Sequence, residues 1–231
     1  MVKNVLITGG NSGIGDAIKK KFEEKSYNVF IVGKKNLKKK NYYKINLENL
    51  IEVKKFTKEI QKIKIDILIN NAGASTVDNA FNFNLKKMSK IHNINFYSAV
   101  IISKSVLKNM INKKWGRIVN ITSIFAEYAR EDRLSYISSK FLLNSLTKSL
   151  AADFSKKNIL CNSVAPGVTN TRLTNKMLNN SYLKKKLLKK IPMKRFAKTN
   201  EIAELVFHLG SNENKFITGQ QIFIDGGFSI I

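Results

Sequence analysis

Three residue types that often mark a chemical site are scarce in this 231-residue sequence, which holds one cysteine, two histidines and two prolines. A single thiol excludes a disulfide within the chain. Cys161 lies in an apolar run typical of a strand, so we expect it to be buried and structural. His92 and His208 stand alone in helical patterns, which predicts no metal site.

Long apolar runs are absent as well. No run reaches the about 18 residues that a membrane-spanning helix needs, and the run that begins at Val2 meets glycine too soon for a secretory signal. We therefore expect a cytoplasmic protein without a membrane partner. Apolar residues still make up 43% of the sequence, with no repeat and no low-complexity tract, so we predict one globular domain over residues 1–231.

Acidic residues are few, 16 against 41 lysines and arginines, which gives a net charge of +25. Such a charge raises the hypothesis of nucleic-acid binding. Only five of the basic residues are arginine, the side chain suited to bidentate phosphate contacts, and the lysines are spread along the chain. We expect no nucleic-acid partner, although a field of this sign attracts acidic molecules of any kind.

The first pattern with chemical meaning is an apolar run over residues 2–8 that ends in a turn rich in glycine. An amphipathic helix follows, with Ile14, Ala17, Ile18 and Phe22 on one face. Glycines in such a turn let the backbone approach a pyrophosphate, and the helix amino terminus offers N–H donors. A glycine-rich turn alone is a weak signal, but its place between a strand and a helix predicts a dinucleotide site.

Residues 25–47 contain neither aspartate nor glutamate. A strand is expected over residues 28–32, and a unit that binds NAD places an acid just after this strand to hold the adenosine ribose. Here Gly33 is followed by Lys34 and Lys35, which attract a 2'-phosphate, so the pattern favours NADP(H) over NAD(H). The general excess of lysine explains these two lysines but not the missing acid.

Strands and helices alternate along the rest of the chain, which is typical of an α/β fold with a parallel sheet. Further strands are predicted over residues 42–46, 66–70, 117–122 and 159–164, and helices over residues 50–62, 85–112 and 135–155. The strand at 42–46 follows its predecessor so closely that the helix between strands two and three is predicted to be missing.

The run from Tyr136 to Lys140 combines an acid with a cation. Side chains four residues apart share one face of a helix, so Lys140 is expected to lower the pKa of the Tyr136 phenol from about 10 toward neutrality. Ser123 follows a predicted strand and is placed to hold a carbonyl oxygen for the tyrosine. By itself, such a pair is more often part of an ordinary amphipathic helix, and the other motifs decide.

Motifs along the whole chain together resemble the short-chain dehydrogenase/reductase family. They are Thr8-Gly9-x-x-x-Gly13-Ile14-Gly15, Asn70-Asn71-Ala72-Gly73, Asn95, Ser123, Tyr136-x-x-x-Lys140, Pro166-Gly167 with Thr171, and the ending from Ile217 to Gly227. The resemblance implies a single α/β domain of the Rossmann type. Its seven-stranded parallel sheet, flanked by helices, has the order 3-2-1-4-5-6-7.

Carried over to this chain, the family's catalytic residues are Asn95, Ser123, Tyr136 and Lys140. The resemblance implies that Tyr136 protonates a carbonyl oxygen as hydride arrives from the nicotinamide, and that Ser123 orients this carbonyl. Lys140 is implied to lower the tyrosine pKa and bind the nicotinamide ribose, and Asn95 to hold a water in a proton relay.

The resemblance also implies a set of cofactor contacts. Asn46 is a departure, because many relatives carry an aspartate there that contacts the adenine, and we expect a weaker contact. Besides Tyr136 and Lys140, the implied contacts are Gly9, Asn11, Ser12, Gly13, Ile14, Gly15, Gly33, Lys34, Asn46, Asn71, Ala72, Gly73, Pro166, Gly167, Val168, Thr169 and Thr171.

Within the family, the chain is most similar to bacterial 3-oxoacyl-(acyl carrier protein) reductases in the spacing of its catalytic residues and in the stretch from Pro192 to Phe196. This resemblance implies a homotetramer that reduces a 3-oxoacyl thioester on acyl carrier protein with NADPH, in fatty acid biosynthesis. The candidates for steering the acidic carrier are Arg130, Arg133, Arg172 and the lysines after Lys156.

Two alternatives stay open. The segment between Ser123 and Tyr136 is unusually charged for an acyl channel, which favours a sugar or another polar carbonyl as substrate; its charged residues are Glu127, Arg130, Glu131, Asp132 and Arg133. The alternative from another class is a catalytically silent protein that binds a dinucleotide or nucleic acid. The complete set of four catalytic residues argues against it.

Overall fold

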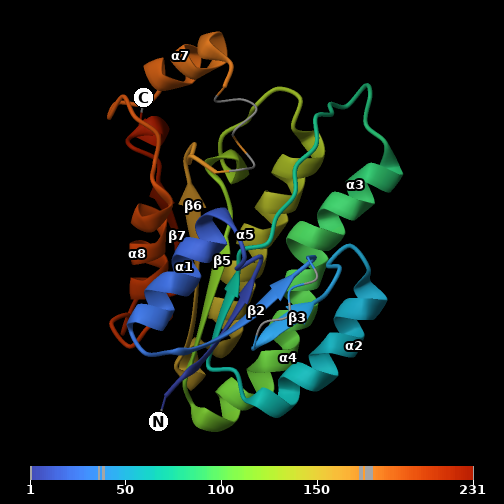
Figure 1. Ribbon diagram of the computed structural model, residues 1–231, viewed down its shortest axis with the longest axis vertical. Helices are drawn as coiled ribbons and strands as arrows, with labels where there is room; N and C mark the ends of the chain where they lie inside the picture. Colours follow the sequence, from blue (N-terminus) through green and yellow to red (C-terminus); the bar gives the residue numbers. More distant parts are fainter. Residues whose placement is uncertain (1, 36, 38–39, 172–173, 175–178, 231) are drawn as a thin grey trace.

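A parallel sheet forms the centre of the computed structural model, which describes residues 2–35, 37, 40–171, 174 and 179–230. Its seven strands lie in the order β3-β2-β1-β4-β5-β6-β7 (Figure 1), as the resemblance implied. The strands are β1 (Asn4–Thr8), β2 (Asn28–Gly33), β3 (Tyr42–Lys44), β4 (Ile67–Asn70), β5 (Gly116–Ile121), β6 (Ile159–Pro166) and β7 (Gln221–Ile224).

Helices cover both faces of the sheet (Figure 1). On one face lie α1 (Gly13–Glu24) and α8 (Thr199–Gly210), and on the other α2 (Leu50–Ile60), α4 (Ser98–Lys113) and α5 (Leu134–Phe154). The helix α3 (Leu85–His92) runs into α4 through the π-helical turn Asn93–Tyr97, and α7 (Ser181–Lys189) lies beyond the carboxyl ends of the strands.

The core has two layers because alternate residues of a strand point to opposite faces of the sheet. Leu6 and Leu68 pack with α2, α4 and α5, while Ile7 and Ile69 pack with α1 and α8. All four side chains are fully buried. Burial on both faces explains why the central strands read as continuous apolar runs in the sequence.

Most predicted elements match the observed ones to within two residues, and two deviations have a clear structural cause. The strand expected over residues 42–46 ends at Lys44, because the chain turns at Asn46, whose carbonyl oxygen accepts the Asn49 N–H at 2.9 Å. The helix expected over residues 85–112 is interrupted by the π-helical turn. Between Gly33 and Tyr42, none of the described residues is helical, in agreement with the predicted loss of a helix there.

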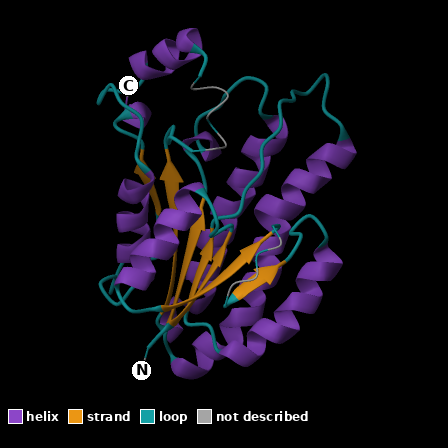
Figure 2. Cartoon of the chain, in the orientation of Figure 1, coloured by secondary structure: helices purple, strands orange, loops and turns teal. Residues whose placement is uncertain are grey.

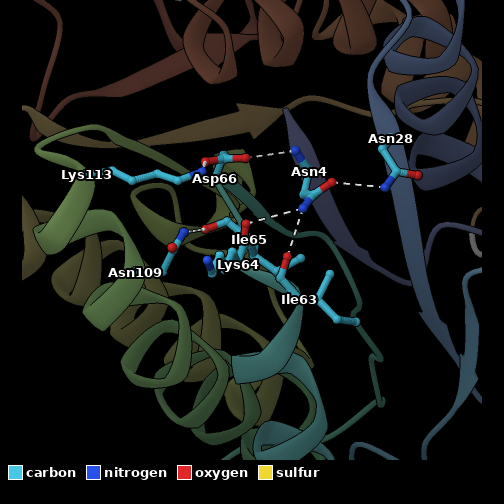
Figure 3. Close-up of polar contacts among 8 residues, drawn as sticks. All are labelled: Asn4, Asn28, Ile63, Lys64, Ile65, Asp66, Asn109 and Lys113. Atoms are coloured by element: carbon cyan, nitrogen blue, oxygen red, sulfur yellow. Dashed lines mark hydrogen bonds and ion pairs between the residues drawn. The ribbon is translucent and has the colours of Figure 1, made fainter. Parts of the chain in front are cut away.

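Polar side chains join β1, β4 and α4 at the amino ends of the strands (Figure 3). The buried Asp66 carboxylate accepts the Asn4 N–H at 2.9 Å and pairs with the Lys113 ammonium. The Asn109 side chain donates to the Ile65 carbonyl oxygen at 2.9 Å. These contacts satisfy groups that the packing of the helices on the sheet would otherwise leave buried and unpaired.

At the opposite end of the sheet the strand arrows end in loops (Figure 2), and several predicted site residues directly follow these strand ends. Gly9 follows β1, Asn71 follows β4, Ser123 follows β5 and Gly167 follows β6. Ligand sites of open parallel sheets lie at these carboxyl ends. Among the described residues, no helix combines the length and the apolar character needed to cross a membrane.

Candidate active site

The glycine turn after β1 packs directly against the turn after β4. The Thr8 hydroxyl oxygen accepts the N–H groups of Asn71 and Ala72, both at 3.0 Å. The Asn71 side chain donates in return to the Thr8 carbonyl oxygen at 2.9 Å. Both turns are therefore fixed relative to each other by one threonine and one asparagine.

Glycine is required in this turn by space as well as by conformation. Gly9 has a φ of +69°, and a Cβ there would lie 3.0 Å from the Ala72 Cα. A Cβ on Gly15 would run into the Gly9 carbonyl oxygen. Ser12, at the start of α1, makes no capping hydrogen bond with its side chain. The turn thus fits a pyrophosphate, which the helix amino terminus can bind through its N–H groups.

One cavity of about 980 Å³ connects the glycine turn to the predicted catalytic residues. Ser123, Tyr136 and Lys140 line it, and so do all of the expected cofactor contacts. The wall also includes Phe125, Arg130 and Arg133, which were not predicted to contact a cofactor. Residues from both ends of the sequence are thus assembled in one concave site, as a dinucleotide with a substrate beside it requires.

Ser123, Tyr136 and Lys140 meet where β5 ends and α5 begins. The Ser123 hydroxyl lies close enough to the Tyr136 phenol to lower its pKa. The Lys140 ammonium donates to the Ile121 carbonyl oxygen at 2.7 Å and lies 6.0 Å from the centre of the Tyr136 ring. Ser123 and Lys140 are only 6% and 3% exposed, so the surrounding chain fixes their positions.

The pKa of Tyr136 does not follow the prediction. Burial raises it, while the neighbouring Ser123 hydroxyl and the charges of Arg133 and Arg130 lower it, and the net shift is upward. The prediction that Lys140 brings this pKa down toward neutrality is wrong here, because desolvation of the phenolate outweighs the nearby charges. Burial also lowers the pKa of Lys140, to about 8.

Asn95 lies behind the cavity rather than in its wall. The π-helical turn directs its side chain inward, where it is 1% exposed. Its oxygen accepts the Ala74 N–H at 2.8 Å, and its amide group donates to the Ala74 carbonyl oxygen at 2.9 Å and to the Ser139 hydroxyl at 2.8 Å. Asn95 thus fixes the segment after Gly73 against α5, and its part in a proton relay stays a prediction.

Asp78 is a residue of this region that sequence reasoning missed. It is 4% exposed, and its carboxylate accepts the Ser135 N–H at 3.1 Å and the Ser135 hydroxyl. Its carbonyl oxygen accepts the Leu134 N–H at 3.0 Å. Arg133, at the start of α5, makes no capping bond with its side chain. An arginine where a capping residue usually stands was the signal that the cap comes from elsewhere.

Gly33, Lys34 and Asn46 line the part of the cavity next to β2. The Asn46 side-chain oxygen accepts the Glu48 N–H at 3.3 Å. This oxygen therefore already has a hydrogen-bond partner within its own loop. Lys34 is exposed, and no acid among the described residues lines this part of the wall. A side chain on Gly33 would collide with the Tyr42 hydroxyl, so that a larger residue there changes the shape of the site as well as its charge.

The histidines and the cysteine lie outside the cavity wall. His92 is 2.8 Å from the Ser138 hydroxyl, and burial lowers its pKa. His208 pairs with Glu213 at the surface. Cys161 is fully buried in β6, and burial raises the pKa of its thiol, which confirms that it is structural. The described part of the chain holds no cluster of metal-ligating side chains.

Comparisons with known sequences connect this site to reductases of acyl groups. A family model described as enoyl-(acyl carrier protein) reductase matches residues 9–229. The 3-oxoacyl-[acyl-carrier-protein] reductase FabG of Buchnera aphidicola subsp. Schizaphis graminum is 36% identical, over 97% of this chain and 96% of its own. The protein of the same name from Aquifex aeolicus is 31% identical, over 96% and 95%.

Solved structures share the fold and hold nicotinamide dinucleotides. The complex of 4-hydroxyisoleucine dehydrogenase with NADH has a TM-score of 0.92 at 33% identity and covers 98% of both chains. The structure of ElxO with NADP has a TM-score of 0.91 at 30% identity and covers 99% of both chains. These similar structures therefore include both forms of the dinucleotide.

Replacing Lys140 by methionine tests the burial of its charge. In the folded chain its pKa is about 8, against an ordinary value of 10.5. Below the folded pKa, both the folded and the unfolded chain hold the proton. Between the two values only the unfolded chain does, so stability rises with pH there. We therefore compare the unfolding free energies of the wild type and Lys140→Met. Between these two pKa values, the difference should change by about 1.4 kcal/mol per pH unit in favour of the wild type.

Urea unfolding across this pH range measures the difference. Lys148→Met is the matched control, since Lys148 lies on the same helix and is exposed. The difference in unfolding free energy between Lys148→Met and the wild type should not change with pH. A Lys140→Met difference that is equally flat contradicts the burial of a charged lysine.

Replacing Asp78 by asparagine tests its role as a positioning residue for α5. We expect a loss of about 1–2 kcal/mol in unfolding free energy, because one capping acceptor and a charge at the helix start are lost. We also expect a lower kcat with little change in cofactor affinity, because Tyr136 follows Ser135 directly while the glycine turn is untouched. Asp153→Asn, at an exposed position of α5, is the control. Equal behaviour of the two variants in urea unfolding and steady-state kinetics would contradict this role.

Proposed function

Since the chain belongs to the short-chain dehydrogenase/reductase family of NAD(P)-dependent oxidoreductases, we propose that it reduces a 3-oxoacyl thioester on acyl carrier protein with NADPH. The product is the 3-hydroxyacyl thioester. One observation carries the chemistry: Ser123, Tyr136 and Lys140 line the same cavity as the glycine turn. The acyl substrate is supported by the relatives named as 3-oxoacyl reductases.

Each of these cavity residues has a separate role in the proposed reaction. The bound dinucleotide supplies the hydride for the carbonyl carbon. Ser123 donates a hydrogen bond to the carbonyl oxygen, and Tyr136 gives this oxygen its proton. The phenol carries this proton at neutral pH, because its pKa lies above the ordinary value of 10. The charges of Arg130 and Arg133 then stabilise the phenolate that remains.

A polar carbonyl compound is the second candidate substrate. The observation that favours it is the pair Arg130 and Arg133 in the cavity wall, since an acyl chain gains nothing from two guanidinium groups. One similar structure belongs to 4-hydroxyisoleucine dehydrogenase, whose named substrate is polar. The relatives named as acyl reductases argue for the thioester, so the two classes need a direct comparison.

Tyr136→Phe tests the proposed chemistry. We expect it to abolish NADPH oxidation with 3-oxoacyl carrier protein, because the proton donor is lost, while NADPH binding by fluorescence stays nearly unchanged. The wild type should lose efficiency with this substrate as salt rises, because attraction of an acidic carrier is screened over about 8 Å. The ethyl ester of the same 3-oxo acid, as the uncharged control, should respond little. Residual turnover near the wild-type rate in Tyr136→Phe would overturn the mechanism.

Screening of this kind concerns the basic groups in the cavity wall. Arg130 and Arg133 line the cavity, whereas Arg172 lies outside the described residues. Failure of the wild type to reduce any carrier-bound thioester would remove the first substrate class and leave the polar carbonyl.

A preference for NADPH is part of the proposal, supported by Lys34 in the cavity wall and by the lack of acids over residues 25–47. We expect Lys34→Gln to raise the Kd for NADPH about tenfold, or ~1.4 kcal/mol, and to leave that for NADH unchanged. Lys35→Gln is the control, because Lys35 is exposed and outside the wall. Fluorescence titration gives both constants. Equal wild-type efficiency with NADPH and NADH would refute the preference.

Assembly into a homotetramer is proposed as well. Tyr97 and Phe141, 45% and 59% exposed, lie on the elements that carry Asn95 and Tyr136. Phe223 and Phe228 near the carboxyl terminus already pack on Tyr128 within the chain, so the ending supports assembly less than its composition suggested. Light scattering at micromolar concentration should give the mass of four chains, and a stable monomer would refute the proposal.

A further inference from the structure

The helix α7 lies beyond the carboxyl ends of the strands (Figure 1), and none of its side chains is buried. It is nevertheless fixed at both ends. The Asn180 side chain accepts the Leu183 N–H at 3.0 Å where the helix begins. Just after its end, Ile191 is 2% exposed, and Met193 donates its N–H to the Gly226 carbonyl oxygen at 3.1 Å. The helix is therefore a held part of the surface.

The segment that holds the end of α7 also contacts the wall of the active-site cavity. Gly167 lines this cavity, and a Cβ added to it would lie 2.8 Å from the Asp225 Cα. Gly226, the next residue after Asp225, accepts the hydrogen bond from Met193. One layer of chain therefore joins the end of α7 to the cavity in which the reaction is proposed to occur.

Tyr182 and three lysines share one exposed face of α7, because residues three and four apart are neighbours on a helix. The lysines are Lys185, Lys186 and Lys189, and we call these four residues the lysine face. All four are exposed, Tyr182 by 71%. Further exposed lysines lie within or just after the helix: Lys184, Lys190 and Lys194.

The charges of the lysine face are not balanced within the described part of the chain. A similar run of three lysines in α1 is fully paired, since Lys19 and Lys20 contact Asp16 and Lys21 contacts Glu204 at 2.6–3.1 Å. No described carboxylate pairs with a lysine of α7. The sequence holds no acid over residues 154–200. Like charges on one helix repel, and an acidic partner relieves this repulsion.

The chemistry of the lysine face favours one kind of acidic partner. It holds no arginine, the side chain suited to forked phosphate contacts, which argues against nucleic acid. Leu187 and Leu188 are half-buried, so α7 does not present an open apolar face to a bilayer. An exposed tyrosine surrounded by lysines is typical of a contact with another protein, where tyrosine is enriched.

We propose that the lysine face of α7 is the docking surface for the acidic carrier protein that brings the thioester substrate. The inference rests on the proposed function and names the place where its carrier binds. Carboxylates of the carrier pair with the three lysines, and Tyr182 packs in the centre of the contact. Docking there brings the carrier close to the cavity. A second copy of this chain docked face to face is repelled, because both faces are positive.

Replacing the three lysines tests the docking surface. Lys185→Gln/Lys186→Gln/Lys189→Gln should lower kcat/KM for 3-oxoacyl carrier protein at least about tenfold, through a higher KM. The same acyl group on N-acetylcysteamine, a small uncharged thiol, should be reduced as by the wild type. Lys54→Gln/Lys55→Gln/Lys58→Gln is the control, because these exposed lysines have the same spacing on α2, far from α7 (Figure 1). It should keep the wild-type KM for the carrier-bound substrate.

Replacing Tyr182 by alanine tests direct contact rather than long-range attraction. Calorimetry with the carrier protein and the NADPH-bound enzyme should show a Kd at least about fivefold higher in Tyr182→Ala. Phe216→Ala is the control, because Phe216 is 96% exposed and lies outside α7. It should leave the Kd unchanged.

The outcomes separate the docking surface from the proposed function. An equal loss in both triple-lysine variants indicates a general effect of charge and overturns the docking surface, while reduction of the carrier-bound thioester still supports the function. If the wild type reduces neither thioester, both fail. Sedimentation with phosphatidylserine vesicles tests the membrane alternative. Vesicle binding that only the α7 triple variant loses, together with unchanged carrier kinetics, would assign the face to lipid and overturn the proposal.

Discussion

The segment from Asn71 to Asp78 is tied to the rest of the fold by polar side chains along its length, and the geometry of the whole site depends on these ties. Thr8 holds its beginning against the glycine turn. Asn95 holds its middle, and its end holds the start of α5 through Ser135. One short stretch of chain therefore sets the distance between the glycine turn and Tyr136.

The site keeps charges where burial disfavours them. Lys140 is nearly inaccessible, and its hydrogen bond to the Ile121 carbonyl oxygen offsets only part of the cost of desolvation, as its lowered pKa shows. Arg130 shows the same effect. Perturbed groups of this kind cluster at functional sites, because a charge that is poorly solvated interacts more strongly with whatever binds beside it. Packing in the remainder of the fold offsets the unfavourable free energy of burying these charges.

Local patterns explain what the sequence could predict. The glycine turn, the strand ends and the four-residue spacing of Tyr136 and Lys140 are set by residues close in sequence, and each lies where it was expected. The cap of α5 could not be found in this way, because Asp78 and Ser135 are 57 residues apart. The π-helical turn at Asn95 was not predicted either. A single turn of this kind lies within a longer helical pattern and leaves the apolar periodicity of the surrounding helices almost unchanged.

The sign of the Tyr136 shift was out of reach for another reason, and it bears on the direction of the reaction. A sequence shows which charges are near the phenol along a helix, but not how much water the fold removes from it. Desolvation proves the larger effect, so the phenol stays protonated at neutral pH. A protonated tyrosine is an acid that can complete a reduction, whereas oxidation of an alcohol needs the phenolate as base. Burial therefore keeps the Tyr136 phenol in its acid form, which is the form that the proposed reduction uses.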